Sequence, residues 1–353
     1  MNENARARPD AASSGPQGSG TGGRTPQRNN RRWMAPWIAL ALLLAGDALF
    51  APGFASLELR DGRLVGALVD ILHRGAPVAL LALGMTPVIA TGGVDLSVGA
   101  VMALSSSCLA ALLAAGGVPA ALAITAAIGV GALLGVWNGI LVAHLRLVPI
   151  VATLVLLTAG RGAAQLVSGS GVARIADPSI TALGCATLFG LPISVFVVLV
   201  LFLGIALLAT RTTFGLHIAA IGGNERAARR SALPVASWLV GVYALAGTSA
   251  SIAGVLVASD IGAADASRIG MYSELDAILA VVLGGTALTG GRMQLLGSLG
   301  GAFLNQAVTT TLYYAGLGSA ATLCVKAAAV ILVVAVQSPR ARTLFWRRHG
   351  STA

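Results

Sequence analysis

The residues best suited to a binding or gating role lie in a glycine-rich stretch between two long apolar runs. This stretch holds the carboxylate of Asp95 and the hydroxyl of Ser97. Lipid cannot hydrogen-bond to an opened backbone, so a break in a spanning segment is tolerated only where protein or water surrounds it. A carboxylate at such a break indicates a path for a polar solute rather than a passive anchor. The residues of this break motif are Thr91, Gly92, Gly93, Asp95, Ser97 and Gly99.

Asp95 has two interpretations, and both make it a helix cap. In the first, it accepts backbone N–H bonds at the start of the following helix, fixes the break and couples it to a gate. In the second, it is an ordinary cap at the cytoplasmic interface, assisted by Ser97. We expect a cap rather than direct contact with a cargo, because the predicted topology puts the motif near the inner face.

A hydrophilic loop at residues 211–233 is the second candidate. Asn224 is suited to cap a short helix with a charged face, and Pro234 to open the next span. A short charged helix tied at both ends to membrane helices can transmit force from a soluble partner. The alternative is an interfacial helix that rests on anionic lipid. The residues of this motif are Gly223, Asn224, Glu225, Arg226, Ala227, Ala228, Arg229 and Arg230.

Five polar residues inside apolar runs are candidates for the pathway: Asn138, Arg161, Glu274, Asp276 and Lys326. A cation within a span needs a partner or water, so we expect Arg161 and Lys326 to pair with acids such as Asp47 or Glu274, with snorkelling as the alternative for Arg161. We place Glu274 and Asp276 at the outer start of their segment. There they either contact a partner protein or the cargo, or serve as N-terminal acids that the helix dipole favours. Asn138 is expected to bond between helices.

No metal or nucleotide chemistry is expected in this chain. Its three cysteines show no paired spacing, and His73 and His144 stand alone near the ends of apolar runs. Lys326 is the single lysine, and it follows Cys324-Val325 rather than a glycine, so there is no P-loop. We therefore predict no cofactor, no ATP site and no enzymatic activity.

The composition is that of a membrane protein. Of 353 residues, 56% are hydrophobic and 10% are charged, whereas a soluble domain has about a quarter charged residues. The net charge of +10 comes mostly from arginines at the two ends and in one loop, which is a topology signal rather than a sign of nucleic-acid binding.

The apolar runs predict an all-α polytopic protein of about ten transmembrane helices, some broken or short. A disordered basic tail at 1–32 and a basic tail at 339–353 flank the transmembrane domain at 33–338. With both termini cytoplasmic, sixteen arginines fall inside and four outside. The predicted spans are 34–54, 64–90, 97–115, 119–144, 148–168, 190–210, 234–258, 274–290, 293–314 and 319–337.

Glycine spacing adds two structural expectations. Gly131, Gly135 and Gly139 form one face of a span and should let another helix approach closely, as should Gly297 and Gly301. The pattern Thr-Gly-Gly, then five other residues, then Gly occurs at 91–99 and again at 289–297. Paired interruptions of this kind are typical of the pathway in transporters built from repeats.

The chain resembles the permease subunits of bacterial ABC sugar importers. Residues 220–231 are similar to the loop by which these permeases engage their ATPase, and residues 89–99 to the hallmark of the ribose/xylose/galactofuranose branch. Residues 138–139, 273–285 and 325–327 carry the resemblance across residues 34–337 in the right order. The runs at 159–162 and 262–266 look closest to galactofuranose-type permeases.

This resemblance implies a subunit of the bacterial inner membrane that moves a monosaccharide inward. Two permease copies, or this chain and a related permease, would form the pathway. A cytoplasmic ATPase holding ATP and Mg would drive it, and a periplasmic binding protein would deliver the sugar. Two other classes remain open: an ion-coupled secondary transporter using Asp95 or Asp276, and a membrane assembly scaffold.

Overall fold

The computed structural model describes residues 33–50, 53–54, 56–60, 62–169 and 171–337. The two predicted basic tails lie outside these residues. The ten predicted spans each correspond to a helix, with ends that differ by a few residues in most cases. These helices are α1 (Met34–Phe50), α2 (Ala67–Ala90), α3 (Val98–Ala114), α4 (Ala120–Ala143), α5 (Pro149–Val167), α7 (Ile193–Arg211), α10 (Val235–Ile261), α11 (Ser273–Leu283), α12 (Leu295–Tyr314) and α13 (Ser319–Gln337).

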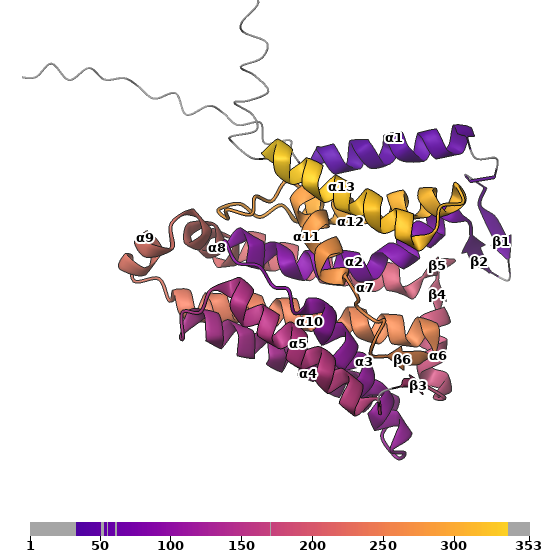
Figure 1. The fold of residues 1–353 in the computed structure, drawn as a ribbon, viewed down its shortest axis with the longest axis horizontal. Helices are drawn as coiled ribbons and strands as arrows, with labels where there is room; N and C mark the ends of the chain where they lie inside the picture. The colour runs from indigo at the N-terminus through magenta and orange to yellow at the C-terminus, as the bar shows by residue number, and fades with distance from the viewer. Residues whose placement is uncertain (1–32, 51–52, 55, 61, 170, 338–353) are drawn as a thin grey trace, which may run out of the picture. The chain divides into compact units, whose positions relative to one another are not determined.

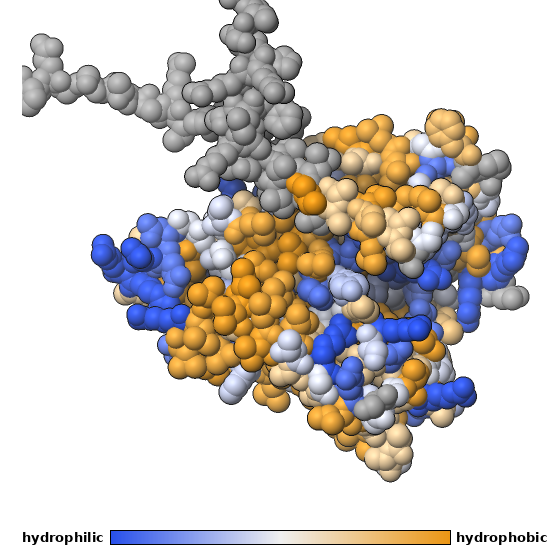
Figure 2. All heavy atoms as spheres, viewed as in Figure 1, coloured by the Kyte–Doolittle hydropathy of each residue, from blue (hydrophilic) through white to orange (hydrophobic). Residues whose placement is uncertain are grey.

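Within the described residues, five helices are long and apolar enough to cross a bilayer: α2, α4, α5, α7 and α10. Helices α1 and α3 are apolar but shorter. The side chains of α4 and α5 that point away from the bundle are largely hydrophobic, and they gather into a broad apolar surface (Figure 2). The structure is therefore that of a polytopic α-helical membrane protein.

The short elements lie at the two ends of the bundle. Three two-stranded antiparallel ribbons lie at one end, together with the short helix α6 (Pro178–Cys185), while α8 (Phe214–Gly223) and α9 (Glu225–Arg230) lie at the opposite end (Figure 1). Helix α9 is the short helix predicted after Asn224, whereas α6, α8 and the ribbons were not predicted. The ribbons pair β1 (Glu58–Arg60) with β2 (Arg63–Val65), β3 (Val172–Arg174) with β6 (Ala263–Asp265), and β4 (Thr187–Leu188) with β5 (Leu191–Pro192).

Glycines bring the central helices together, as predicted. A Cβ on Gly135 would collide with the carbonyl oxygen of Tyr243, and a Cβ on Gly139 would lie 2.6 Å from the Cα of Val240. The glycine face of α4 thus packs directly on the backbone of α10. A second contact of the same kind joins Gly301 of α12 to the backbone of α11. Close backbone approach supplies van der Waals contact where lipid gives helices no hydrophobic reason to associate.

Candidate functional site

The first helix break forms a buried polar cluster. Helix α2 ends at Ala90 and α3 begins at Val98, and between them Asp95 is 1% exposed. Its Oδ1 accepts hydrogen bonds from the Ser97 backbone N–H (2.9 Å) and from the Ser97 hydroxyl (2.6 Å). The Asn138 side chain of α4 donates to the same hydroxyl at 2.9 Å. Asp95 and Asn138 therefore hold the irregular segment from within the bundle.

Two further polar atoms in this cluster have no hydrogen-bond partner among the described residues. They are the hydroxyl of Tyr243 and the Oδ1 of Asn138. Gly93 leaves room for the tyrosine, because a Cβ there would lie 2.7 Å from its hydroxyl oxygen. Sequence reasoning missed Tyr243, since no local motif marks it.

The second break lies against the first. The chain between α11 and α12 passes through Gly290 and Gly291, whose backbones have φ of 81° and 89°. The Gly291 N–H donates to the Ala90 carbonyl at 2.8 Å. The two Thr-Gly-Gly patterns found in the sequence are thus neighbours in space.

The end of α8 meets both breaks. A side chain on Gly222 would collide with the Ala90 carbonyl oxygen and with the Gly291 amide nitrogen. We name this meeting point the glycine junction and define it as Ala90, Gly92, Gly222, Gly290 and Gly291. It joins the hydrophilic loop to the end of α2 and to the segment that precedes α12 by close backbone contact, and Phe214 and Ile218 of α8 also pack with Val88 of α2.

Helix α9 follows the junction directly. The Asn224 side chain caps it by accepting the Ala227 N–H at 3.0 Å, as the sequence suggested. Glu225 and Arg229 form an ion pair one turn apart at 2.8 Å, and Ala228 is buried. Pro234 precedes the first residue of α10. The helix presents the charged face Glu225, Arg226, Arg229 and Arg230 to the outside of the bundle.

Glu274 lies in the first turn of α11, at the start of its segment as predicted, and its place on the outer side stays a prediction. The neighbours of Glu274 are Gly99 at the start of α3 and Arg161 in α5. Before α11 begins, Ala266 and Ile269 are buried and Gly270 lies against the backbone of Gly99 at the start of α3, whereas Arg268 is exposed. Helix α11 then has eleven residues, fewer than the about 20 needed to cross a bilayer. The predicted span 274–290 is a half-length helix followed by an irregular segment.

Arg161 is satisfied by backbone rather than by an acid. It donates to the carbonyls of Ala266 (3.2 Å) and Ile269 (2.5 Å), both in the segment before α11. The carboxylate of Glu274 lies near enough to interact electrostatically, yet its Oε2 is buried without a hydrogen-bond partner among the described residues. Arg161 therefore holds residues 266–269 against α5.

Lys326 pairs with Asp276, which corrects the expected pairing with Asp47 or Glu274. The ammonium lies 3.0 Å and 3.1 Å from the two carboxylate oxygens, and the two side chains are 17% and 22% exposed. Asp47 instead accepts a hydrogen bond from the Thr311 hydroxyl at 2.6 Å. A surface groove of about 420 Å³ lies beside the ion pair, between α11 and α13.

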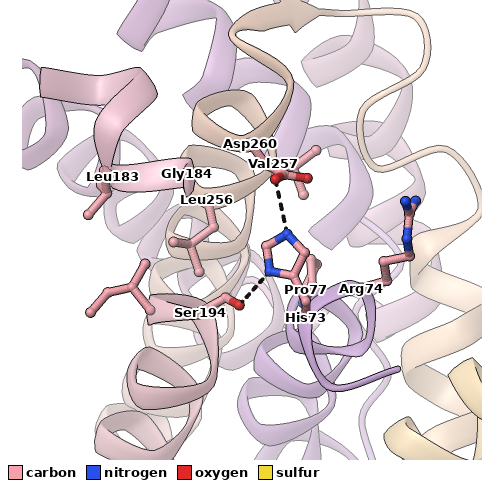
Figure 3. A pocket seen from close by; sticks show the side chains of 10 residues that line it. His73, Arg74, Pro77, Leu183, Gly184, Ser194, Leu256, Val257 and Asp260 are labelled. Carbon is pink, nitrogen blue, oxygen red and sulfur yellow. Dashed lines mark hydrogen bonds and ion pairs between the residues drawn. The ribbon is translucent and has the colours of Figure 1, made fainter. Parts of the chain in front are cut away.

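A third polar cluster, at the end of the bundle away from α8 and α9, was missed by sequence reasoning. His73 of α2 is not isolated: its Nδ1 lies 2.9 Å from the Ser194 hydroxyl of α7, and its Nε2 lies 3.0 Å from the Asp260 carboxylate of α10 (Figure 3). The cluster borders a cavity of about 160 Å³. The three residues are far apart in the chain, so no spacing could have indicated them.

The family model and the relatives that match this chain are all described as permeases. Residues 67–335 match a family model described as "Branched-chain amino acid transport system / permease component". The chain is 45% identical to the galactofuranose transporter permease protein of Escherichia coli, over 90% of this chain and 93% of that protein. It is 33% identical to the fructose import permease protein of Bifidobacterium longum (87% and 88%) and 34% identical to the ribose import permease protein of Escherichia coli (86% and 92%). No solved structure matches the chain.

Proposed function

Because the chain belongs to the family of transport permease components that its residues 67–335 match, we propose that it is the pathway subunit of an ATP-driven importer for a monosaccharide. The three relatives reported above are named for galactofuranose, fructose and ribose, and all three are monosaccharides. Nothing in these relatives supports the ion-coupled alternative. The sugar is expected to come from a periplasmic binding protein, and ATP and Mg to reside on a separate ATPase.

The observation that carries this proposal is the glycine junction. An external motor needs a rigid contact between a surface element and the segments that open the path. Helix α9 is such a surface element. Helix α8 precedes it in the chain and ends at the junction, where Gly222 has no side chain to separate the backbones. We expect a movement of α9 to displace the end of α2 and the segment before α12 together.

The two broken segments are the elements that such a movement would open. Helices α3 and α11 both begin inside the bundle, where Gly99 touches the backbone of Gly270. Discontinuous helices of this kind place polar groups and free backbone at membrane depth, which is tolerated where they line a path. We assign Asp95 and Asn138 the role of holding the first break in register.

The Asp276–Lys326 ion pair indicates which face of the chain borders the path. A partly exposed charged pair in a spanning region is stable against protein or water and not against hydrocarbon. We propose that this face, with the groove between α11 and α13, meets a second permease copy or a related permease across the path. In this arrangement both chain termini and α9 are cytoplasmic, and the protein resides in the bacterial inner membrane.

The test is charge reversal on α9 in the complete importer. Glu225→Arg and Arg229→Glu should each abolish sugar-stimulated ATP hydrolysis, while the amount of protein in the membrane stays unchanged. The i,i+4 ion pair itself contributes only about 0.3–0.5 kcal/mol, so its loss should not unfold the chain.

A double variant separates recognition of the ATPase from stability of the helix. Glu225→Arg combined with Arg229→Glu restores an ion pair within α9 but leaves its charges reversed toward a partner. Coupling should remain lost in this variant. Normal sugar-stimulated hydrolysis in both single variants would overturn the proposed function.

A further inference from the structure

The cavity beside His73 lies at the end of the bundle opposite the glycine junction and plays no part in the coupling described above. We propose that it is a binding subsite for a single monosaccharide at the outer mouth of the pathway. This inference rests on the proposed function for the class of its ligand. It concerns a different part of the chain from the coupling loop.

The polar side of the cavity is a chain of three side chains from three helices. An ionised carboxylate can only accept, so the His73 Nε2 carries the proton that is donated to Asp260. The Nδ1 then accepts from the Ser194 hydroxyl. No described residue bonds to the second carboxylate oxygen of Asp260, whose side chain is 49% exposed. That oxygen is available to accept a ligand hydroxyl.

The charges at the cavity favour a neutral ligand rather than an ion. Arg74 is exposed, lines the cavity and interacts electrostatically with Asp260. A guanidinium provides donors and the carboxylate provides acceptors, with no large excess of either sign. Neutral compounds with several hydroxyls use both kinds of group at once. Figure 3 shows His73 between Asp260 and Ser194, with Arg74 one residue further along α2.

The size and the apolar wall favour one sugar ring. Leu183, Leu256 and Val257 line the cavity and offer surface to the C–H face of a ring. Its volume of about 160 Å³ is similar to that of an engineered cavity of about 150 Å³ that binds benzene. The cavity therefore holds one six-membered ring with its hydroxyls toward the polar and open sides, and it has no room for a second ring. A small apolar pocket with a few convergent polar groups is the general form of a small-molecule site.

The position of the cavity suits an entry subsite. Ser194 is the second residue of α7 and Asp260 is the penultimate residue of α10, so both lie at the same end of the bundle as the three ribbons (Figure 1). His73 lies six residues into α2, which is about 9 Å along the helix. A sugar delivered from outside would reach this cavity before the two helix breaks.

The experiment is saturation-transfer NMR on the full chain in lipid nanodiscs, without ATPase or binding protein. The probes are D-galactose, D-ribose and D-fructose, with maltose as the disaccharide. The proposal predicts transfer to at least one monosaccharide and none to maltose. Leu183→Trp, which fills the cavity, and Asp260→Ala, which removes the acceptor, should each reduce that signal at least tenfold. Leu207→Trp on the exposed face of α7, where Leu207 is 59% exposed, should leave it unchanged.

The outcomes separate this inference from the proposed function. Equal signals in the unmodified chain and in Leu183→Trp would overturn the subsite, as would transfer to no monosaccharide. Neither result would change the expectation that Glu225→Arg abolishes sugar-stimulated ATP hydrolysis, because that expectation rests on the proposed function alone. Conversely, Glu225→Arg should keep the NMR signal while it abolishes coupling. Because Asp260→Ala removes a partner of His73, its elution as a single species in size-exclusion chromatography is checked first.

Discussion

The ion pair between Asp276 and Lys326 shows how a charged side chain inside an apolar bundle is stabilised. Both carboxylate oxygens lie within 3.1 Å of the ammonium, and most of each side chain is shielded. A charge left without its partner in such surroundings is costly, whereas loss of both charges can be nearly neutral for stability. Stability and transport should therefore respond differently to single and double substitutions.

We predict that Asp276→Leu alone destabilises the chain by about 3–5 kcal/mol, because Lys326 is left unpaired. Asp276→Leu combined with Lys326→Met should recover most of that loss, since two apolar side chains replace the pair. Thermal unfolding of the purified protein in detergent measures both. Sugar uptake should stay low in the double variant, because the polar groups assigned to the path are absent. Full uptake by a stable double variant would remove this pair from the pathway.

Among elements, the contact of α8 with the two breaks is the most sensitive to small changes. Gly222→Ala should reduce sugar-stimulated ATP hydrolysis strongly, because its Cβ would collide with the Ala90 carbonyl and the Gly291 amide nitrogen. Gly204→Ala is the matched control: nothing lies within 4 Å of the added Cβ, and the site is in the exposed part of α7. ATPase assays on the reconstituted complex compare the two. Equal activities would show that the junction does not transmit movement.

The packing of α4 on α10 gives a second prediction for an element. Gly135→Ala should lower the midpoint of thermal unfolding, because overpacking of a close contact costs about 1–3 kcal/mol. Gly129→Ala in the same helix meets open space and should not lower the midpoint. A thermal-unfolding scan of both variants distinguishes a specific helix contact from a general effect of removing glycine.

The helices were predictable from sequence because each of the ten predicted spans is a run of apolar residues, although only five of the resulting helices are long and apolar enough to cross a bilayer within the described residues. The glycine faces and the Asn224 cap were also predictable, because each depends on residues that lie close together in the sequence. Three features were not predictable. Gly270 packs against Gly99 at the start of α3, Lys326 pairs with Asp276 across 50 residues, and His73 meets Ser194 and Asp260. Each depends on which distant segments become neighbours, and no local spacing encodes that.

At the scale of the whole molecule, the two ends of the bundle have different tasks in this account. One end carries α8 and α9, and the other carries the ribbons (Figure 1). The glycine junction lies at the end of α8, and the cavity beside His73 is lined by residues at the start of α7 and the end of α10. Long apolar helices join the ends and present hydrophobic side chains outward (Figure 2). The polar groups in between belong to broken helices, so opening the path requires those breaks to move.

The membrane side on which α9 lies tests this account most directly. In a chain whose Cys108, Cys185 and Cys324 are replaced by Ser, Arg226→Cys is exposed at one end and Arg60→Cys at the other, where the Arg60 side chain is 70% exposed. The reagent is a membrane-impermeant maleimide, applied to right-side-out and to inverted vesicles lacking the ATPase. The account predicts labelling of Arg226→Cys in inverted vesicles alone and of Arg60→Cys in right-side-out vesicles alone. Labelling of Arg226→Cys from the outside would contradict it.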